Sequence, residues 1–335
     1  MKKIFNIATK NHKDYFEVEI VIAGITIRFQ TDHQTDVDCL NGLLLYHKNT
    51  NNIPHEAGKM VHNIVITSSS KQFDLPKDIV PIWEGFVSTE YPIAMVWHNS
   101  KVANENFITV GKDILIHHIP ESRLTNCYLK EEKNIFGKSQ RPILSIYLFL
   151  LIHSILSMYG KYSIHSSCVA KNGLAYLFLG KSGAGKTTIS TTLGRVGFDY
   201  MGDDLTFISR NKSGEIIAEP LLFAAKIVDE KVTKKLKKDN IDVIKDYDFT
   251  YSYQQRLGAI FLLQKTPSRN SSILQPVTQG EVYGWLMNSG NNIKMQYNPQ
   301  LWLDVCEQAA TLSSYNMIFG NKEYFNPEIL NNVIK

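Results

Sequence analysis

A chain of 335 residues exceeds the size at which one hydrophobic core usually stops growing, about 250–300 residues, so two domains are expected. Its 44% hydrophobic and 20% charged residues are typical of a soluble globular protein. The net charge of +4 is too small to indicate a nucleic-acid partner. The basic run at 231–238 contains no aromatic residue, so it is predicted to be a solvated helix face and not a nucleic-acid groove. We therefore expect no nucleic acid among the partners.

The cysteines indicate a reducing compartment. Cys39, Cys127, Cys168 and Cys306 lie far apart and form no C-x-x-C pair, which argues against a disulfide scaffold and against a zinc site. The first residues are basic but lack a long apolar core, so no signal peptide is predicted. The apolar stretch 143–158 is short for a membrane span and contains polar residues, so it is predicted to be a buried helix. A cytoplasmic location without a membrane partner is expected.

Residues 1–130 are predicted to form a β-rich domain, because short runs of β-branched and aromatic residues alternate with Asn, Gly, Ser and Pro. Strands are predicted at 15–22, 25–29, 61–67, 93–97, 107–110 and 114–118, and a short helix at 38–47. His117 and His118 are adjacent and would point to opposite faces of a strand, so they are interpreted as structural or surface residues. Since no catalytic constellation is present, this domain is expected to recognise an acceptor or to mediate assembly.

Residues 131–335 are predicted to form an α/β domain, because strand and helix patterns alternate there. Strands are predicted at 162–170, 175–179, 198–202, 205–209, 215–218, 257–263 and 315–319. Helices are predicted at 143–158, from 187 to a C-cap at Gly197, at 228–238, from 278, at 299–312 and after Asn326.

The centre of this domain is a glycine-rich turn between a predicted strand and a predicted helix. Gly180, Gly185, Lys186 and Thr187 match the pattern G-x-x-x-x-G-K-[ST]. Such a turn lets backbone N–H groups surround a diphosphate, while the lysine reaches the β- and γ-phosphates and the threonine hydroxyl ligates Mg²⁺. ATP and Mg²⁺ are thus the expected cofactors, and the alternative is a turn that binds nothing. The expected nucleotide-binding residues are Gly180, Lys181, Ser182, Gly183, Ala184, Gly185, Lys186, Thr187 and Thr188.

Three further features suggest phosphoryl transfer. Asp203 and Asp204 follow a short strand beyond the loop helix; one can hold Mg²⁺ while the other takes the proton of an attacking hydroxyl, and the alternative is an ordinary turn. His165, on the strand before the loop strand, can steady a phosphate or the catalytic acid, or be a satisfied core histidine. Arg256 can stabilise the charge of the transferred phosphate, or be a surface arginine.

The segments 164–170, 177–188 and 202–204 together resemble the HPr kinase/phosphorylase family. The likeness extends to the broader group of HPr-kinase-like proteins, which includes kinases encoded with lasso peptides. The resemblance implies a P-loop kinase fold of the α/β class shared with phosphoenolpyruvate carboxykinase. It also implies a base at Asp204, a supporting histidine at His165 and Mg²⁺ near Thr187; Asp203 is expected to hold the metal or its water.

The chain departs from that family after the Asp pair. The family carries a glycine-rich signature there, which residues 218–226 do not resemble, so no phosphorylase activity is predicted and HPr is not assigned as the substrate. Glu219, in this region, is a candidate metal or substrate contact. The predicted function is an ATP-dependent kinase that transfers the γ-phosphoryl group to a serine hydroxyl of a protein or peptide. A nucleotide-binding regulator, a carboxykinase-like enzyme and a small-molecule phosphotransferase stay open as alternative functions. The sequence also leaves it open whether the protein forms an oligomer.

Overall fold

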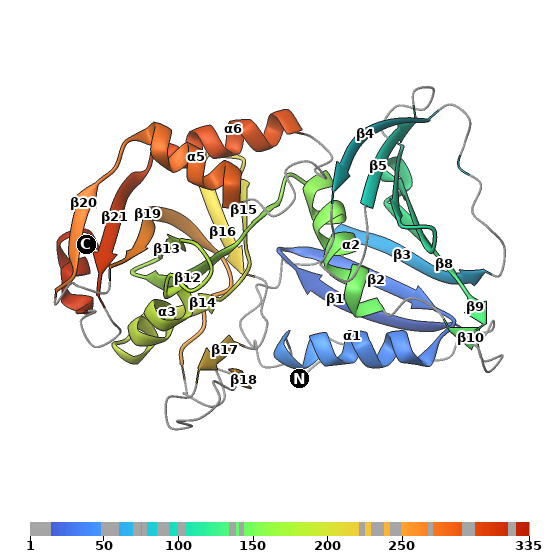
Figure 1. Ribbon diagram of the computed structural model, residues 1–335, viewed down its shortest axis with the longest axis horizontal. Helices are drawn as coiled ribbons and strands as arrows, with labels where there is room; N and C mark the ends of the chain where they lie inside the picture. The colour runs from blue at the N-terminus through green and yellow to red at the C-terminus, as the bar shows by residue number, and fades with distance from the viewer. Residues whose placement is uncertain are drawn as a thin grey trace. The chain divides into compact units, whose positions relative to one another are not determined.

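The structure is a computed structural model, with its elements labelled in Figure 1. It describes residues 15–47, 60–69, 75, 79–85, 94–99, 105–133, 139–140, 144–220, 225–228, 238–241, 249–266, 271–289, 299–320 and 326–334.

The described residues form two compact units; the first ends at Tyr159 and the second begins at Gly160, apart from Tyr46 and His47, which are grouped with the second. The sequence places the division near residue 130 instead, and the difference lies in the segment that contains helix α2 (Leu144–Met158). This segment belongs to the first unit, where the Tyr159 hydroxyl shares a hydrogen bond of 2.8 Å with Nδ1 of His62. Because α2 is apolar, it has to bury its surface against a core, and it does so as part of the β-rich first unit.

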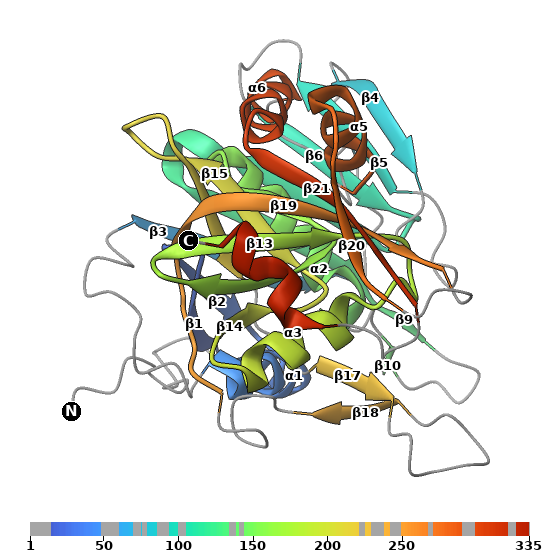
Figure 2. The same cartoon turned by 90° about the vertical axis from the view of Figure 1, so that its left-hand side faces the viewer.

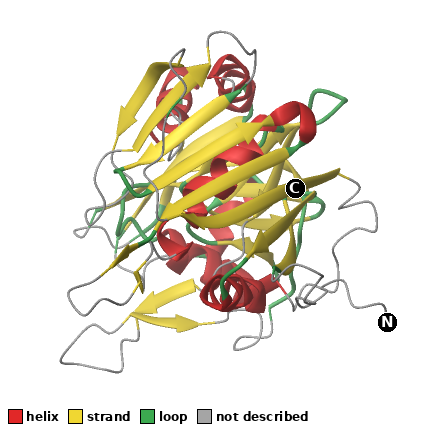
Figure 3. Cartoon of the chain, turned by 90° about the vertical axis from the view of Figure 1, so that its right-hand side faces the viewer, coloured by secondary structure: helices red, strands yellow, loops and turns green. Residues whose placement is uncertain are grey.

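The first unit is built on an eight-stranded mixed sheet in the order β1-β2-β3-β8-β7-β6-β5-β4. Among the described strands of this sheet, the two parallel pairs are β2 with β3 and β3 with β8. Strands dominate this unit (Figure 3), which confirms the β-rich prediction, although β4 and β8 are missing from the predicted strands. The strands are β1 (Phe16–Ile22), β2 (Ile25–Thr31), β3 (Met60–Ser69), β4 (Ile79–Gly85), β5 (Ala94–Asn99), β6 (Asn106–Val110), β7 (Ile114–Ile119) and β8 (Leu124–Lys130).

The smaller elements of the first unit are α1 (Gln34–His47), η1 (Pro120–Ser122), β9 (Glu132–Lys133) and β10 (Ser139–Gln140). α2 confirms the buried helix predicted at 143–158, with Leu151, Ile152 and Ile155 fully buried. None of the described helices is both long enough and apolar enough to cross a membrane. On β7, His118 is buried while His117 pairs with Glu105, so both histidines take part in local structure.

The second unit is built on a nine-stranded mixed sheet in the order β11-β15-β16-β19-β13-β12-β14, with β21 beside β19 and β20 beside β21. Its strands are β11 (Tyr162–Ile164), β12 (Ser166–Lys171), β13 (Leu174–Leu179), β14 (Asp199–Gly202), β15 (Thr206–Arg210), β16 (Ile216–Pro220), β19 (Gln255–Lys265), β20 (Ile273–Pro276) and β21 (Ser313–Phe319). A separate pair is β17 (Ala225–Val228) and β18 (Lys238–Ile241), and the helices are α3 (Lys186–Arg195), α5 (Gln279–Ser289), α6 (Pro299–Ala310) and η4 (Pro327–Asn332).

Helices cover both faces of this sheet (Figure 2). Leu177 of β13 packs in the core cluster of α5 and α6, whereas its neighbour Phe178 packs in the cluster that contains Ile189 of α3. Because successive side chains of a strand point to opposite faces, a strand that is covered twice has to be apolar throughout. This explains why β13 reads as one apolar run directly before the glycine-rich loop.

Two predicted elements differ from the structure. Val228 pairs with Lys238 across β17 and β18, so a single helix over 228–238 is wrong: its ends would lie about 15 Å apart. The residues between these strands, which include most of the basic run at 231–238, lie outside the described part of the chain. The strand predicted at 162–170 is interrupted at His165, because β11 pairs with β15 whereas β12 pairs with β13 and β14.

Candidate functional site

Three segments meet at one edge of the second sheet. β13 and β14 both run antiparallel to β12, so they run in the same direction and end at the same edge. The glycine-rich loop follows β13 at Gly180, and Asp203 follows β14. His165 lies at this edge as well, because β12 runs the opposite way and begins there. Open α/β sheets bind ligands at the carboxyl ends of their strands, so this edge is the candidate site.

The loop has glycines at two positions, 180 and 185, where a side chain would not fit. Gly185 has a φ of +96°, and a Cβ there would lie 3.1 Å from the Phe319 ring. A Cβ on Gly180 would lie 2.9 Å from the Ala184 side chain. α3 begins at Lys186, and no side chain of the described residues caps its N-terminus by a hydrogen bond. The first N–H groups of α3 are therefore left for a ligand, and an anion suits them best.

The other loop residues divide by exposure. Lys181, Ser182 and Gly183 are exposed and can meet a ligand, while Thr188 is half-buried in the first turn of α3. Ala184 is buried, and its side chain packs in the core cluster below the loop. Ala184 therefore offers a ligand only its backbone, and its N–H donates to the Lys181 carbonyl at 3.0 Å.

The Lys186 ammonium group lies across the loop. Its Nζ donates to the Gly180 carbonyl at 2.9 Å and to the Lys181 carbonyl at 3.4 Å. Burial lowers the pKa of Lys186, while the charges of Asp203 and Asp204 oppose that shift. A poorly hydrated ammonium group held by two neutral carbonyls would gain from an anionic partner, which is what phosphate oxygens would supply.

Thr187 and Asp203 form the closest polar contact of the site. The Thr187 hydroxyl donates to Oδ2 of Asp203 at 2.5 Å, and Asp203 is 4% exposed. The other carboxylate oxygen, Oδ1, is buried and accepts no hydrogen bond from the described residues. Burial raises the pKa of Asp203 to about 6; the hydrogen bond from Thr187 opposes this shift, and the charge of Asp204 adds to it.

These features fit a divalent cation. A hydroxyl and a buried carboxylate beside it are the oxygen ligands that Mg²⁺ takes in phosphate sites. A cation would satisfy the free Oδ1 and lower the pKa of Asp203 again. Thr187 and Asp203 are thus the residues that would hold the metal.

Asp204 and His165 lie beside this pair in different environments. Asp204 is exposed and has a φ of +69°. Nδ1 of His165 lies 3.0 Å from the Asp204 carbonyl oxygen, and since a carbonyl only accepts, Nδ1 carries the proton. In the neutral ring, Nε2 is then an acceptor. His165 thus contacts the Asp204 backbone and not its carboxylate, so it positions the turn.

The structure does not bring Arg256 to the site. Arg256 pairs with Leu174 at the start of β13, whereas the loop follows the other end of that strand at Leu179. Five residues of strand separate the two ends, roughly 16 Å. The guanidinium group instead donates to Oε1 of Glu215 at 3.1 Å, and its side chain is 56% exposed. The structure therefore does not place the Arg256 guanidinium group beside the loop, and this position agrees with the alternative of a surface arginine.

Glu219 also has a different role from the one suggested by its sequence position. Its side chain is buried and forms an ion pair with Lys161. The Gln254 amide donates to its other oxygen at 3.1 Å. Both carboxylate oxygens are therefore engaged by the protein, so Glu219 is a structural residue.

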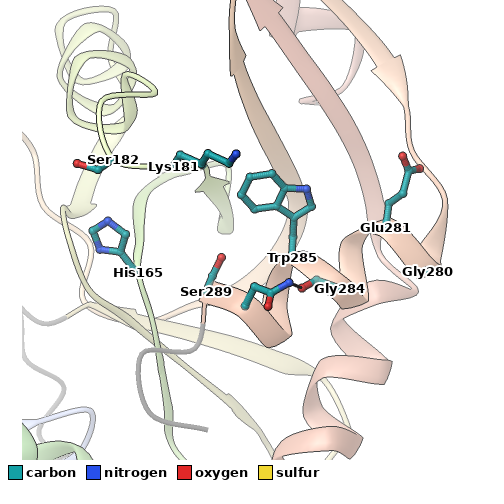
Figure 4. Close-up of a pocket in the computed structure, with 10 residues that line it drawn as sticks. His165, Lys181, Ser182, Gly280, Glu281, Gly284, Trp285 and Ser289 are labelled. Atoms are coloured by element: carbon teal, nitrogen blue, oxygen red, sulfur yellow. Dashed lines mark hydrogen bonds between the residues drawn. The ribbon is translucent and has the colours of Figure 1, made fainter. Parts of the chain in front are cut away.

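A cavity of about 600 Å³ opens beside the first residues of the loop (Figure 4). Its walls come from the loop, from His165 and from α5. The α5 residues that line it are Gly280, Glu281, Gly284, Trp285, Asn288 and Ser289. The sequence predicts this helix but assigns none of its residues to a site. The available signal is the pair of glycines four residues apart, which leaves the helix surface at these two positions without side chains.

No family model matches the sequence, and no curated protein matches it. Among solved structures, the chain is similar to the Hpr(Ser) kinase/phosphatase from Coxiella burnetii, with 13% sequence identity and a TM-score of 0.29. The similarity covers 51% of this chain and 90% of that chain.

Proposed function

We propose that the protein is an ATP-dependent phosphotransferase that uses Mg²⁺ and transfers the γ-phosphoryl group to a serine hydroxyl of a protein or peptide. The observation that carries the proposal is the contact of Thr187 with the buried Asp203, with the exposed Asp204 next to it. A hydroxyl and a carboxylate that can hold a metal, with a second carboxylate free to meet an acceptor, are what phosphoryl transfer requires beside a phosphate loop.

Each residue then has one role. The N–H groups of the loop and of α3 bind the phosphates, and Lys186 leaves its carbonyl partners to neutralise the charge of the transferred group. Thr187 and Asp203 would hold Mg²⁺, which when bound would neutralise the developing charge on the phosphate oxygens. Asp204 accepts the proton of the attacking hydroxyl, and His165 fixes the turn that presents it.

The assignment of serine as the acceptor is supported by the resemblance of the sequence motifs to HPr-kinase-like proteins. A nucleotide-binding regulator has no use for an exposed carboxylate beside a metal pair. A carboxykinase needs further metal ligands, and the described residues include no group of three or more His, Cys, Asp or Glu side chains that could hold an ion. A small-molecule phosphotransferase would use the same groups, so acceptor trials should include small alcohols.

Incubation of the full chain with ATP, Mg²⁺ and a pool of serine-containing peptides tests the proposal by mass spectrometry. The expected product is a peptide heavier by one phosphate. Lys186→Ala should lower its formation about 10³-fold or more, because a charge-assisted contact in the transition state is lost. Lys212→Ala, in the exposed turn between β15 and β16, is the matched control and should leave the rate unchanged. A Lys186→Ala protein with near-normal turnover would contradict the proposal.

A further inference from the structure

The cavity beside the loop is continuous with the place where phosphates would bind. Gly180, Lys181 and Ser182 belong both to the loop and to the cavity wall. A ligand whose phosphates occupy the loop can therefore extend into the cavity without crossing protein. Neither Asp203 nor Asp204 is among the described residues that line it. His165, whose ring contacts the Asp204 carbonyl, does line the cavity, so the two carboxylates stay outside the cavity wall while His165 borders it.

The helix wall of the cavity is open where side chains would normally stand. No heavy atom of the described residues lies within 4 Å of a Cβ added to Gly280 or Gly284, outside their own helix and chain neighbours. These two glycines are four residues apart and share one helix face, which faces the cavity. Glycine is the poorest helix former after proline, so nothing in helix stability explains two of them in α5.

Trp285 gives this wall a flat aromatic surface. Its indole ring projects from α5 into the space between the helix and Lys181, and it is half-buried (Figure 4). An aromatic plane next to a bare helix face forms a slot that fits a planar ring, and bases stack on aromatic side chains whatever their identity. The volume of about 600 Å³ is within the range of sites for small organic ligands.

We propose that this cavity is the nucleobase subsite of the nucleotide site, in which the base stacks on Trp285 against the face formed by Gly280 and Gly284. The inference rests on the proposed function, because it takes the phosphates of the same ligand to lie in the loop. It assigns to α5 the recognition of the nucleoside, whereas the loop and the acids recognise phosphate and metal.

Gly284→Ala distinguishes the binding of the base from the binding of the phosphates. The added methyl group projects into the cavity while it improves the helix, so the melting temperature should stay the same or rise. The dissociation constants of Mg·ATP and Mg·tripolyphosphate are measured for this variant, for Trp285→Ala and for the wild type. In both variants the affinity for ATP should fall about tenfold or more, and that for tripolyphosphate should stay within about twofold. Glu307→Ala, at an exposed position of α6, is the control and should change neither affinity.

The same measurements contain the outcomes that overturn the inference. Unchanged ATP affinity in Gly284→Ala and Trp285→Ala would show that no base occupies the cavity. The cavity would then be a candidate binding site for the acceptor. An equal loss of ATP and tripolyphosphate affinity would place phosphates there and also overturn it. Tripolyphosphate that binds the wild type but not Lys186→Ala supports the phosphate site whatever happens at α5. A wild type that binds neither ligand would overturn the proposed function and the subsite together.

Discussion

Asp204 has a backbone conformation that determines where its carboxylate lies. Its φ of +69° is left-handed, which costs most residues free energy but is tolerated best by Gly, Asn and Asp. The turn sends two neighbouring carboxylates to different places: Asp203 is buried against Thr187, and Asp204 is exposed. Two acids next to each other in sequence can thus divide metal binding and proton transfer between them.

Asp204→Asn tests the proton acceptor. Asparagine keeps the shape of the side chain and the tolerance for left-handed φ, but it cannot take a proton. We expect the ATP affinity to stay within a few-fold and the rate of phosphate transfer to fall by about 10² or more. The measurement compares nucleotide binding with single-turnover transfer at saturating Mg²⁺. A normal transfer rate in Asp204→Asn would place the base elsewhere.

Asp203→Asn tests the metal ligand. Replacing a buried carboxylate by an amide weakens an Mg²⁺ site, so the Mg²⁺ concentration needed for half-maximal transfer should rise at least tenfold. The Mg²⁺ titration is compared with that of Asp204→Asn, whose requirement should change much less. Identical Mg²⁺ titrations for the two variants would remove the division of roles between the acids.

Arg256→Ala should have little effect on catalysis, against the expectation from the sequence. Arg256 lies beside the end of β13 that is far from the loop, and its guanidinium group forms an ion pair with the exposed Glu215. Exposed ion pairs contribute little to stability, so the melting temperature should change little as well. The rate of phosphate transfer should stay within about threefold of the wild type. A loss of tenfold or more would return Arg256 to the site.

Strands β3, β7 and β8 of the first unit share a buried histidine network. Thr125 lies 2.7 Å from Nε2 of His62 and 2.8 Å from Nδ1 of His118. Burial lowers the pKa of His62 to about 4, with a further contribution from the charge of Arg123. Burial likewise lowers the pKa of His118 to about 3. Both rings are therefore neutral in the folded unit at neutral pH.

This network predicts acid sensitivity of the first unit. Below pH 6.5 the unfolded chain takes up protons on these histidines, while the folded chain does not until the pH reaches about 4 at His62 and about 3 at His118. The stability that they contribute is therefore present above pH 6.5 and is lost as the pH falls from 6.5 through 4 toward 3. Hydrogen exchange of β3, β7 and β8 should speed up over this range. His118→Gln should reduce the pH dependence, and the exposed His33→Gln should leave it unchanged; an equal slope in His118→Gln would refute the assignment.

The break between β11 and β12 shows how an element boundary places a functional side chain. The N–H of His165 donates to the Ser289 carbonyl at the end of α5, at 2.9 Å. At the same residue the chain leaves β15 and joins β13. A continuous strand over 162–170 would keep His165 inside a ladder, whereas the break moves it to the edge where the loop and the Asp pair meet.

The division of the chain predicts which fragment folds. A fragment of residues 160–335 should be monodisperse and bind Mg·ATP, since it keeps the loop, Thr187 and Asp203. A fragment of residues 131–335 should aggregate, because α2 would lose the unit that buries Leu151 and Ile155. Size-exclusion chromatography with light scattering compares the two. Equal solution behaviour would show that α2 does not depend on the first unit.

The same fragment tests the role proposed for the first unit. If that unit recognises the acceptor, residues 160–335 should bind ATP with nearly the affinity of the full chain but phosphorylate the acceptor poorly. Full phosphorylation by the fragment would refute this division of labour.

Features encoded in neighbouring residues could be predicted from the sequence. The loop between β13 and α3, the left-handed Gly197 (φ +86°) directly after the C-cap Val196 of α3, and most strands of both units follow from local spacing and from glycine geometry. The proximity of the Asp pair to the loop follows too, because only one helix and one short strand separate them. These features depend on backbone conformations that a few consecutive residues set by themselves.

The rest depends on which strands pair and in what register, and no short stretch of sequence determines that. Strand pairing places Arg256 at the end of β13 that is far from the loop, and the folded sheet brings Glu219 to Lys161. Helix docking assigns α2 to the first unit. It also brought α5 against the loop, which created the cavity around Trp285. Strand pairing and helix docking are settled by burial over the entire core, so residues far apart in the chain become neighbours only in the folded protein.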